Sequence, residues 1–404
     1  MEGRGSLRVR GSKTTKKPED FPLSGVNESN MRLPMRCLAH NRRVLVLVVV
    51  LGLVCLAIVS LPLFETESSV QLDWHVDPAH KQSVHQYIHK VLEGECQPGS
   101  ARQSLLARLP PSSQITQPFL WKDVPLPDDL FLFSPPFGFR GLQDKLKDLL
   151  SLLPDSDSVS KLGQASNKCQ RCVVVGNGGI LRGLELGPLI NQYDIIIRLN
   201  SGPLGEFSTD VGNRTSIRMS YPEGTPLAWV DTDTDTLFVA VVYKSVDISW
   251  TSAMINKLAV PLWEWLFFWQ KVPNQIPLEP HRFRLLNPQV IRETALDLLK
   301  YPPPRPRLWG WDQNVPTLGV SALNLASLLC DEVSLAGFGY NLSHQGAPLH
   351  YYDHLTMSAM QQQKMHNVDR ETELLQSLIK AGTITDLTGG IHCSFCPSLS
   401  TRGI

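Results

Sequence analysis

The strongest constraint on the fold is a short β-branched run that ends in a glycine-rich turn. Val173 to Val175 is typical of a buried strand, and Gly176 to Gly179 (Gly-Asn-Gly-Gly) is typical of the turn after it. A second apolar strand, Asp194 to Asn200, follows. Strand, turn, helix and strand then fit into about thirty residues, the length of a βαβ unit. Such units bind ligands at the carboxyl ends of their strands, so the turn is a candidate binding site.

The turn matches neither of the common phosphate-binding fingerprints. It is not G-x-G-x-x-G, and no G-x-x-x-x-G-K-[ST] follows it. A tight turn with a purely structural role is therefore an equally open interpretation.

The rest of the chain alternates between strand and helix patterns. The runs at 237–243, 283–287 and 332–336 are typical of buried strands, whereas 142–153, 290–299 and 317–329 carry apolar residues at helical spacing. This alternation predicts an α/β domain with a mostly parallel sheet.

An uncharged apolar run near the N-terminus predicts a membrane anchor. Residues 44–64 contain no charge, and about twenty apolar residues span a bilayer. Arg42 and Arg43 precede the run, and Glu65 and Glu67 follow it. The positive-inside rule then places the N-terminus in the cytosol. A cleaved signal peptide is the alternative, which the long preceding segment disfavours.

This topology divides the chain into four parts. We expect a cytoplasmic tail at 1–43, a transmembrane signal anchor at 44–64, a stem at 65–134 and a lumenal catalytic domain at 135–404. The formal net charge is zero, which gives no sign of nucleic-acid binding.

Six cysteines fall on the lumenal side of the predicted anchor, where disulfides are stable. They are Cys96, Cys169, Cys172, Cys330, Cys393 and Cys396. Sequence alone leaves all their pairings open. Four of them form two C-x-x-C pairs, but the long gap between these pairs argues against a zinc site. Asn213 and Asn341 begin lumenal N-glycosylation sequons.

Two further stretches each have two interpretations. Asp231, Asp233 and Asp235 form a D-x-D pattern, which could hold a divalent metal, although an exposed acidic loop is favoured. The stretch from Ala259 to Val272 is rich in aromatic residues. A helix packed into the core is favoured for it. The alternative is an apolar lip that touches a membrane or a lipid part of the substrate.

Two histidines are candidates for proton transfer, the usual role of this side chain near neutral pH. His350 is followed by Tyr351-Tyr352-Asp353, and His366 precedes Glu371 by five residues. At this spacing on a helix the two side chains are not stacked, so Glu371 need not orient His366. The alternative for each histidine is a structural role.

These segments together resemble the animal sialyltransferases. Cys169 to Asn213 resembles the large sialylmotif of that family, and Asn314 to Gly339 resembles the small one. His350 to Asp353 is similar to the third motif, and His366 with Glu371 is similar to the very small motif. The four occur in the order and spacing of the family, and the predicted anchor agrees with it.

The resemblance implies a Rossmann-like domain, a variant of the GT-A glycosyltransferase fold, that uses CMP-sialic acid as donor and no metal or other cofactor. His366 would be the general base, and His350 would help the CMP phosphate to leave. Cys172 would pair with Cys330, and Cys96 with Cys169. The donor-binding residues that the resemblance implies are Asn177, Gly178, Gly179, Asn200, Thr317, Gly319, Gly337 and Tyr351.

The acceptor is inferred from a finer resemblance. His75 to Pro78, Pro135 to Arg140, Leu286 to Pro288 and Glu293 to Ala295 are similar to the branch of the family whose acceptor is lactosylceramide. We therefore expect a single-pass type II protein of the Golgi membrane that makes a ganglioside by α-2,3-sialylation with inversion.

Three other functions remain open. They are sialylation of glycoprotein or other glycolipid galactosides, glycan binding without catalysis, and a metal-dependent transfer that uses Asp231 and Asp233. The C-terminal tail has no equivalent in the resemblance. Cys393 and Cys396 could pair with each other, remain free or link two chains into a homodimer.

Overall fold

The computed structural model describes residues 44–55, 75–111, 117–155, 168–304, 314–339, 346–362 and 365–396. The chain separates into two compact units, Met1–Ser68 and Ser69–Ile404. In the first unit, residues 44–55 form a helix with largely exposed side chains. Within the described ranges, no helix is long and apolar enough to cross a membrane. The predicted tail at 1–43 and the anchor residues 56–64 lie outside those ranges.

The second unit is built on one sheet, to which eight strands of the described residues belong. They are β1 (Phe119–Leu120), β2 (Arg171–Val175), β3 (Ile195–Leu199), β4 (Ile217–Ser220), β5 (Leu237–Ala240), β6 (Phe283–Leu286), β7 (Glu332–Ala336) and β8 (Thr385–Asp386). Their order is β1-β6-β5-β4-β3-β2-β7-β8, and every neighbouring pair except β1–β6 is parallel. The predicted α/β class with a mostly parallel sheet is confirmed.

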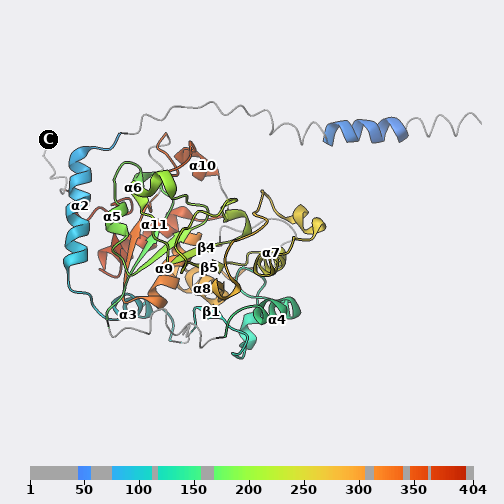
Figure 1. The fold of residues 1–404 in the computed structure, drawn as a ribbon, viewed down its shortest axis with the longest axis horizontal. Helices are drawn as coiled ribbons and strands as arrows, with labels where there is room; N and C mark the ends of the chain where they lie inside the picture. The colour runs from blue at the N-terminus through green and yellow to red at the C-terminus, as the bar shows by residue number, and fades with distance from the viewer. Residues whose placement is uncertain are drawn as a thin grey trace, which may run out of the picture. The chain divides into compact units, whose positions relative to one another are not determined.

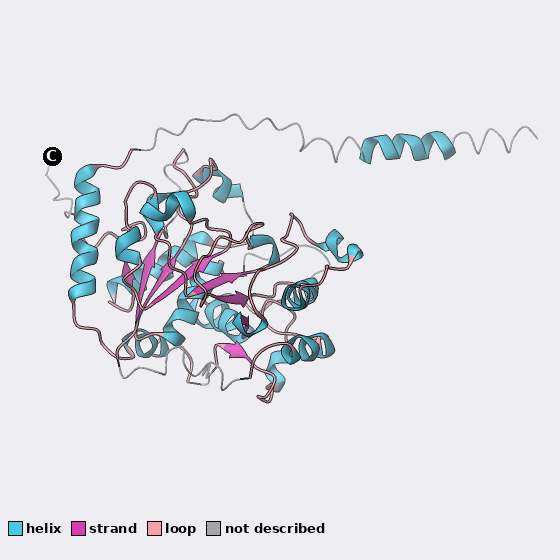
Figure 2. Cartoon of the chain, viewed as in Figure 1, coloured by secondary structure: helices cyan, strands magenta, loops and turns pink. Residues whose placement is uncertain are grey.

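Helices lie on both sides of the strands (Figure 1, Figure 2). They include α2 (Pro78–Glu93), α3 (Ser100–Leu106), α4 (Gln143–Ser151), α5 (Gly187–Ile190), α6 (Ser208–Val211), α7 (Ser245–Asn256), α8 (Pro288–Arg292), α9 (Leu318–Leu329), α10 (Met357–Gln362) and α11 (Val368–Lys380). Asp77 caps α2 by accepting a hydrogen bond from the Ala79 amide, and Pro78 supplies a fixed φ at the first position.

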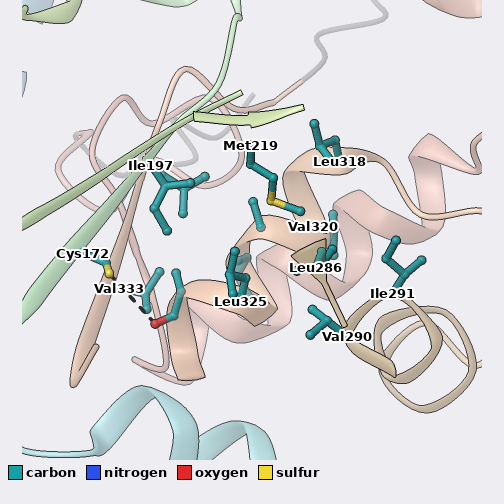
Figure 3. Packing of buried hydrophobic residues seen from close by; sticks show 14 of the residues in the cluster. Cys172, Ile197, Met219, Leu286, Val290, Ile291, Leu318, Val320, Leu325 and Val333 are labelled. Atoms are coloured by element: carbon teal, nitrogen blue, oxygen red, sulfur yellow. Dashed lines mark hydrogen bonds between the residues drawn. The ribbon is translucent and has the colours of Figure 1, made fainter. Parts of the chain in front are cut away.

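Alternating side chains of the central strands supply two cores. In β2, Cys172 and Val174 pack in the cluster that contains α9, whereas Val173 and Val175 pack in the cluster that contains α2 and α5. Figure 3 shows Leu318, Val320 and Leu325 of α9 among side chains of the sheet. Because β2 is buried on both faces, its run from Cys172 to Val175 is apolar without polar alternation.

The connection from β2 to β3 differs from the single helix that the βαβ pattern predicts. It consists of a 3-10 turn at Gly179–Leu181 and the four-residue helix α5. Gly183 and Glu185 have positive φ, which a continuous helix cannot contain.

The strand order reverses at β2. From β2 the chain moves outward through β3, β4, β5 and β6, and it then returns to place β7 on the other side of β2. Open α/β sheets bind ligands beyond the strand ends at such a switch point. The turn after β2 lies at this position.

Three disulfides are present in the described part of the chain. Cys96–Cys169 and Cys172–Cys330 are the two pairs that the family resemblance implies. The second joins β2 to the residue that ends α9. Cys393 and Cys396 form the third, so of the three alternatives left open for the tail the structure has the local pair.

Candidate active site

A cavity of about 500 Å³ opens at the carboxyl ends of β2, β3, β4, β5 and β7. The first turns of α9 and α11 close it from the side. Most of the predicted site residues line it, namely Asn177, Gly178, Asn200, Thr317, Gly319, Gly337, His350 and His366. The fold thus brings together segments that are far apart in the sequence.

Gly179 and Tyr351 are predicted donor-binding residues that do not line the cavity. A Cβ on Gly179 would lie 2.3 Å from the carbonyl oxygen of Pro348, so this glycine permits a close backbone contact. Tyr351 is buried, and its hydroxyl donates to the carbonyl of Pro203. Its amide donates to the carbonyl of Asn177. The structure therefore places both residues outside the cavity lining, and Tyr351 supports Asn177 from there.

The glycine-rich turn is held against the end of β7. The amide of Gly178 donates to the carbonyl of Gly337, and a Cβ on Gly178 would lie only 2.5 Å from that oxygen. Gly337 itself has a φ of +72°. Gly178 and Gly337 therefore have a structural role, because they allow this close backbone contact. Both also line the cavity.

The N-terminus of α9 is fixed by a buried carboxylate. Glu371, in the first turn of α11, accepts hydrogen bonds from the amide of Thr317 at 2.7 Å and from its hydroxyl at 2.6 Å. The same hydroxyl accepts from the amide of Val320, which caps α9. Burial raises the pKa of Glu371 to about 7. As the sequence spacing suggests, these contacts of Glu371 go to Thr317 and not to His366.

His366 is mostly enclosed, and its tautomer is set by the main chain. Its Nδ1 lies 2.8 Å from the carbonyl oxygen of Val315, which can only accept, so Nδ1 carries the proton. Nε2 is then the proton-accepting nitrogen of the ring. Burial lowers the pKa of His366 below its ordinary value, which favours the neutral, basic form at pH 7.

His350 has a different environment. Its Nδ1 donates to the carboxylate of Asp353 at 2.7 Å, and its ring stacks on Tyr352 with ring centres 5.2 Å apart. The backbone of His350 also pairs with Gly178. A carboxylate on Nδ1 orients the imidazole and leaves Nε2 as its free ring nitrogen. Such a ring at the cavity surface can donate to an anion.

The opposite side of the cavity contains a charged cluster that the sequence did not single out. The ammonium of Lys244 lies 2.7 Å from carboxylate oxygens of both Glu223 and Asp247. Both carboxylate side chains are fully buried, and burial raises the pKa of Asp247 to about 6. Lys244 follows the predicted strand at 237–243, so its position at a strand end was the available signal.

Aspartates of the D-x-D segment form ion pairs and hydrogen bonds within the fold. The side chains of Asp231 and Arg218 form a fully buried ion pair, and Asp231 also accepts from the hydroxyl of Thr215. Asp235 pairs with Arg282 at the surface. The expected exposed loop is thus wrong for Asp231. Within the described ranges, no group of three or more His, Cys, Asp or Glu side chains could hold a metal ion.

The aromatic stretch at 259–272 differs from the helix that was predicted for it. It forms a 3-10 turn, Leu262–Phe267, instead of a core helix. Trp265 and Phe268 pack against the core, but Leu262, Leu266 and Trp269 are exposed by 88, 85 and 67%. The favoured interpretation was wrong because aromatic content alone does not show which side of a turn faces the core.

One predicted glycosylation site is described. Asn213 is exposed, and its side-chain oxygen accepts a hydrogen bond from the side-chain Nδ2 of Asn191. Asn341 lies outside the described residues.

The fold is an α/β fold with a cavity at the switch point of its sheet, and sequence comparison gives the family. The family model for glycosyltransferase family 29 (sialyltransferase) matches residues 119–383. This chain therefore belongs to glycosyltransferase family 29, the sialyltransferases, and is a sialyltransferase enzyme.

Curated relatives agree with this assignment. Lactosylceramide alpha-2,3-sialyltransferase of Homo sapiens is 45% identical over 91% of this chain and 87% of its own length. The protein of that name from Rattus norvegicus is 47% identical over 86% of this chain and 89% of its own. The human CMP-N-acetylneuraminate-beta-1,4-galactoside alpha-2,3-sialyltransferase is 40% identical over 74% of this chain and 78% of its own.

A solved structure supports the fold. The crystal structure of a mammalian sialyltransferase superimposes with a TM-score of 0.53 at 22% identity, covering 70% of this chain and 93% of that one.

Proposed function

We propose that the protein transfers sialic acid from CMP-sialic acid to the 3-hydroxyl of the terminal galactose of lactosylceramide. The proposed acceptor rests on sequence identity. The chain is 45–49% identical to proteins named lactosylceramide alpha-2,3-sialyltransferase and 40% identical to the beta-1,4-galactoside enzyme. Sialylation of other galactosides is the second candidate, which the 40% relatives favour.

The donor would lie over the glycine-rich turn. Asn177 and Asn200, with the backbone at Gly178, would hold the cytidine and its ribose phosphate. The first turn of α9, at Thr317 and Gly319, would face the phosphate or the carboxylate. Amides in the first turn of a helix have no partner within it, which suits an anion. The amide and hydroxyl of Thr317 both donate to Glu371, so Thr317 would position this turn while the amides that follow it face the anion.

The two histidines would divide the chemistry of one displacement. The neutral ring of His366 would take the proton of the acceptor 3-hydroxyl as its oxygen attacks the anomeric carbon. The bond from that carbon to the CMP phosphate would break on the opposite face, which inverts the configuration. His350, oriented by Asp353, would donate to the leaving phosphate and offset its charge.

The location of the enzyme is also part of the proposal. A signal anchor at 44–64 would make it a single-pass type II protein with a Golgi lumenal catalytic domain. The helix at 44–55 and the disulfides Cys96–Cys169 and Cys172–Cys330 support a membrane-bound chain in an oxidising compartment.

The acceptor is tested by offering lactosylceramide, free lactose and a desialylated glycoprotein to the full-length enzyme, with CMP-sialic acid in excess chelator. We expect strong transfer to lactosylceramide. Preference for the glycoprotein would reject the acceptor, and dependence on added manganese would reject the metal-free mechanism.

The role of His366 is tested by His366→Ala. Loss of a general base lowers kcat by about 10²–10⁴-fold. We expect that loss with CMP binding retained. His354 is exposed and does not line the cavity, so His354→Ala is the matched control and should stay within about twofold. Loss of CMP binding in His366→Ala would assign His366 another role.

A further inference from the structure

The 3-10 turn after α7 exposes a compact group of large apolar side chains. We call Leu262, Trp263, Leu266, Phe267 and Trp269 the apolar lobe. All five side chains are at least 55% exposed. The turn extends beyond α7 at the edge of the domain (Figure 1). Scattered exposed leucines are ordinary on a protein surface, but a contiguous aromatic group marks an interaction site.

In this turn the charged side chain is buried and most of the apolar side chains are exposed, the opposite of the arrangement expected in water. Its charged residue, Glu264, is only 3% exposed, and its Oε2 has no hydrogen-bond partner among the described residues. Trp265 and Phe268 hold the turn to the core and contact each other with ring centres 6.0 Å apart. The turn therefore buries a carboxylate and presents apolar groups, an arrangement suited to an apolar environment.

The apolar lobe is continuous with the rim of the cavity. Trp269 lines the cavity, and its amide donates to the buried carboxylate of Glu223 at 3.4 Å. The neighbouring Phe268 ring lies 5.1 Å from the ammonium of Lys244, which also lines the cavity. Whatever covers the lobe must therefore lie next to the opening of the active site.

We propose that the apolar lobe inserts into the surface of a lipid bilayer and holds the cavity rim at the membrane. The inference rests on the proposed function: the ceramide of a glycolipid acceptor stays in the bilayer, so its two sugars reach only a short distance from the surface. Tryptophan and leucine side chains are suited to the membrane interface. With the predicted anchor at 44–64, the lobe gives the chain a second point of membrane contact.

The test uses the full-length enzyme reconstituted into phosphatidylcholine vesicles. The triple variant Trp263→Ser/Leu266→Ser/Phe267→Ser removes the outer lobe and leaves Trp269 in the cavity rim. The matched control, Leu106→Ser/Leu132→Ser, replaces leucines that are 40 and 54% exposed and do not line the cavity. Transfer is measured to lactosylceramide in the vesicles and to lactose in solution.

We expect the triple variant to lose about tenfold or more of kcat/KM for the vesicle acceptor, because apolar contact with the bilayer is removed. Transfer to lactose should stay within about twofold, and the control should match the wild type on both acceptors. Equal transfer by variant and wild type in vesicles would overturn the proposal. So would an equal loss on lactose, which would make the lobe part of the active-site framework.

A second measurement does not depend on activity. Brominated phosphatidylcholine should quench the tryptophan fluorescence of the wild type more than that of Trp263→Phe. Equal quenching would overturn bilayer insertion even if the enzyme is active. A dimer in detergent that the triple variant converts to a monomer, with vesicle activity unchanged, would assign the lobe to a second copy instead. If the wild type transfers to neither acceptor, the proposed function fails, while quenching still reports on the lobe.

Discussion

The two sides of the cavity are built in different ways. The first side, which we call the motif side, consists of the turn after β2, the end of β7 and the first turns of α9 and α11. The opposite side consists of Tyr221, Glu223, Tyr243, Lys244 and Trp269. Main-chain contacts hold the glycine-rich turn of the motif side, as in the Gly178–Gly337 hydrogen bond. Buried charges and aromatic rings dominate the opposite side.

This difference matches two requirements of a transferase, which are to bind the donor and to recognise the acceptor. A donor common to the whole family can be held by backbone groups, whose positions the fold determines. An acceptor that differs between relatives is better recognised by side chains, which can change without altering the sheet. The motif side would then determine the reaction, and the opposite side with its apolar lobe would determine which galactoside is presented.

The largest effect that tests this comparison concerns the disulfide of the motif side. Cys172–Cys330 closes a loop of 158 residues and Cys393–Cys396 a loop of 3, so the loss of loop entropy predicts about 5 against about 2 kcal/mol. We expect Cys172→Ser to prevent folding of the enzyme in the secretory pathway and Cys393→Ser to lower Tm slightly. Equal expression and Tm for the two variants would show that the motif side does not depend on its disulfide.

The charged cluster gives the corresponding test of the opposite side. Lys244→Met leaves the buried carboxylates of Glu223 and Asp247 without their cation, which costs about 3–5 kcal/mol. Lys257→Met removes an exposed ion pair with Glu279 and should cost less than about 1 kcal/mol. Urea denaturation compares the two. A small effect at Lys244 would mean that Glu223 and Asp247 do not need its charge to stay buried.

The sequence predicts the motif side better than the opposite side for a physical reason. β2 contains a continuous apolar run, and both β2 and β7 are followed directly by a glycine, so their ends can be located from the sequence. Topology then brings those ends together. The strand β4 was not predicted, because only Ile217 and Met219 of its four residues are apolar, and the fold buries the charge of Arg218 against Asp231.

The opposite side depends on contacts that no local pattern contains. Glu223 approaches Lys244 only because β4 and β5 are neighbours, and Trp269 reaches the rim only because Trp265 and Phe268 turn inward. Lys244 could have been placed at a strand end, with Asp247 three residues later in the first turn of α7, but its partner Glu223 could not. The burial of Glu264 likewise depends on tertiary contacts, and it could not be predicted from the apolar composition of the turn.

The smallest expected effect is a pH dependence that belongs to Glu371 on the motif side. Burial raises its pKa from 4.5 to about 7, so the native state retains a proton that the unfolded chain has already released. The stabilisation is complete below about pH 4.5 and is lost as the pH rises through 7. Glu371→Gln stays neutral throughout. The free energy of unfolding of the wild type, measured relative to Glu371→Gln, should therefore fall by on the order of 2–3 kcal/mol from pH 4.5 to 8.

Chemical denaturation at several pH values measures this difference. Asp247, with its pKa raised to about 6, and His366 are present in both proteins, so their titration cancels. A constant difference between wild type and variant would contradict a raised pKa at Glu371. A difference that grows with pH would mean that the hydrogen bonds from Thr317 stabilise the ionised carboxylate more than burial opposes it. The α9 N-terminus would then face the donor beside a permanent negative charge, and its preference for an anion would be weaker than the motif side requires.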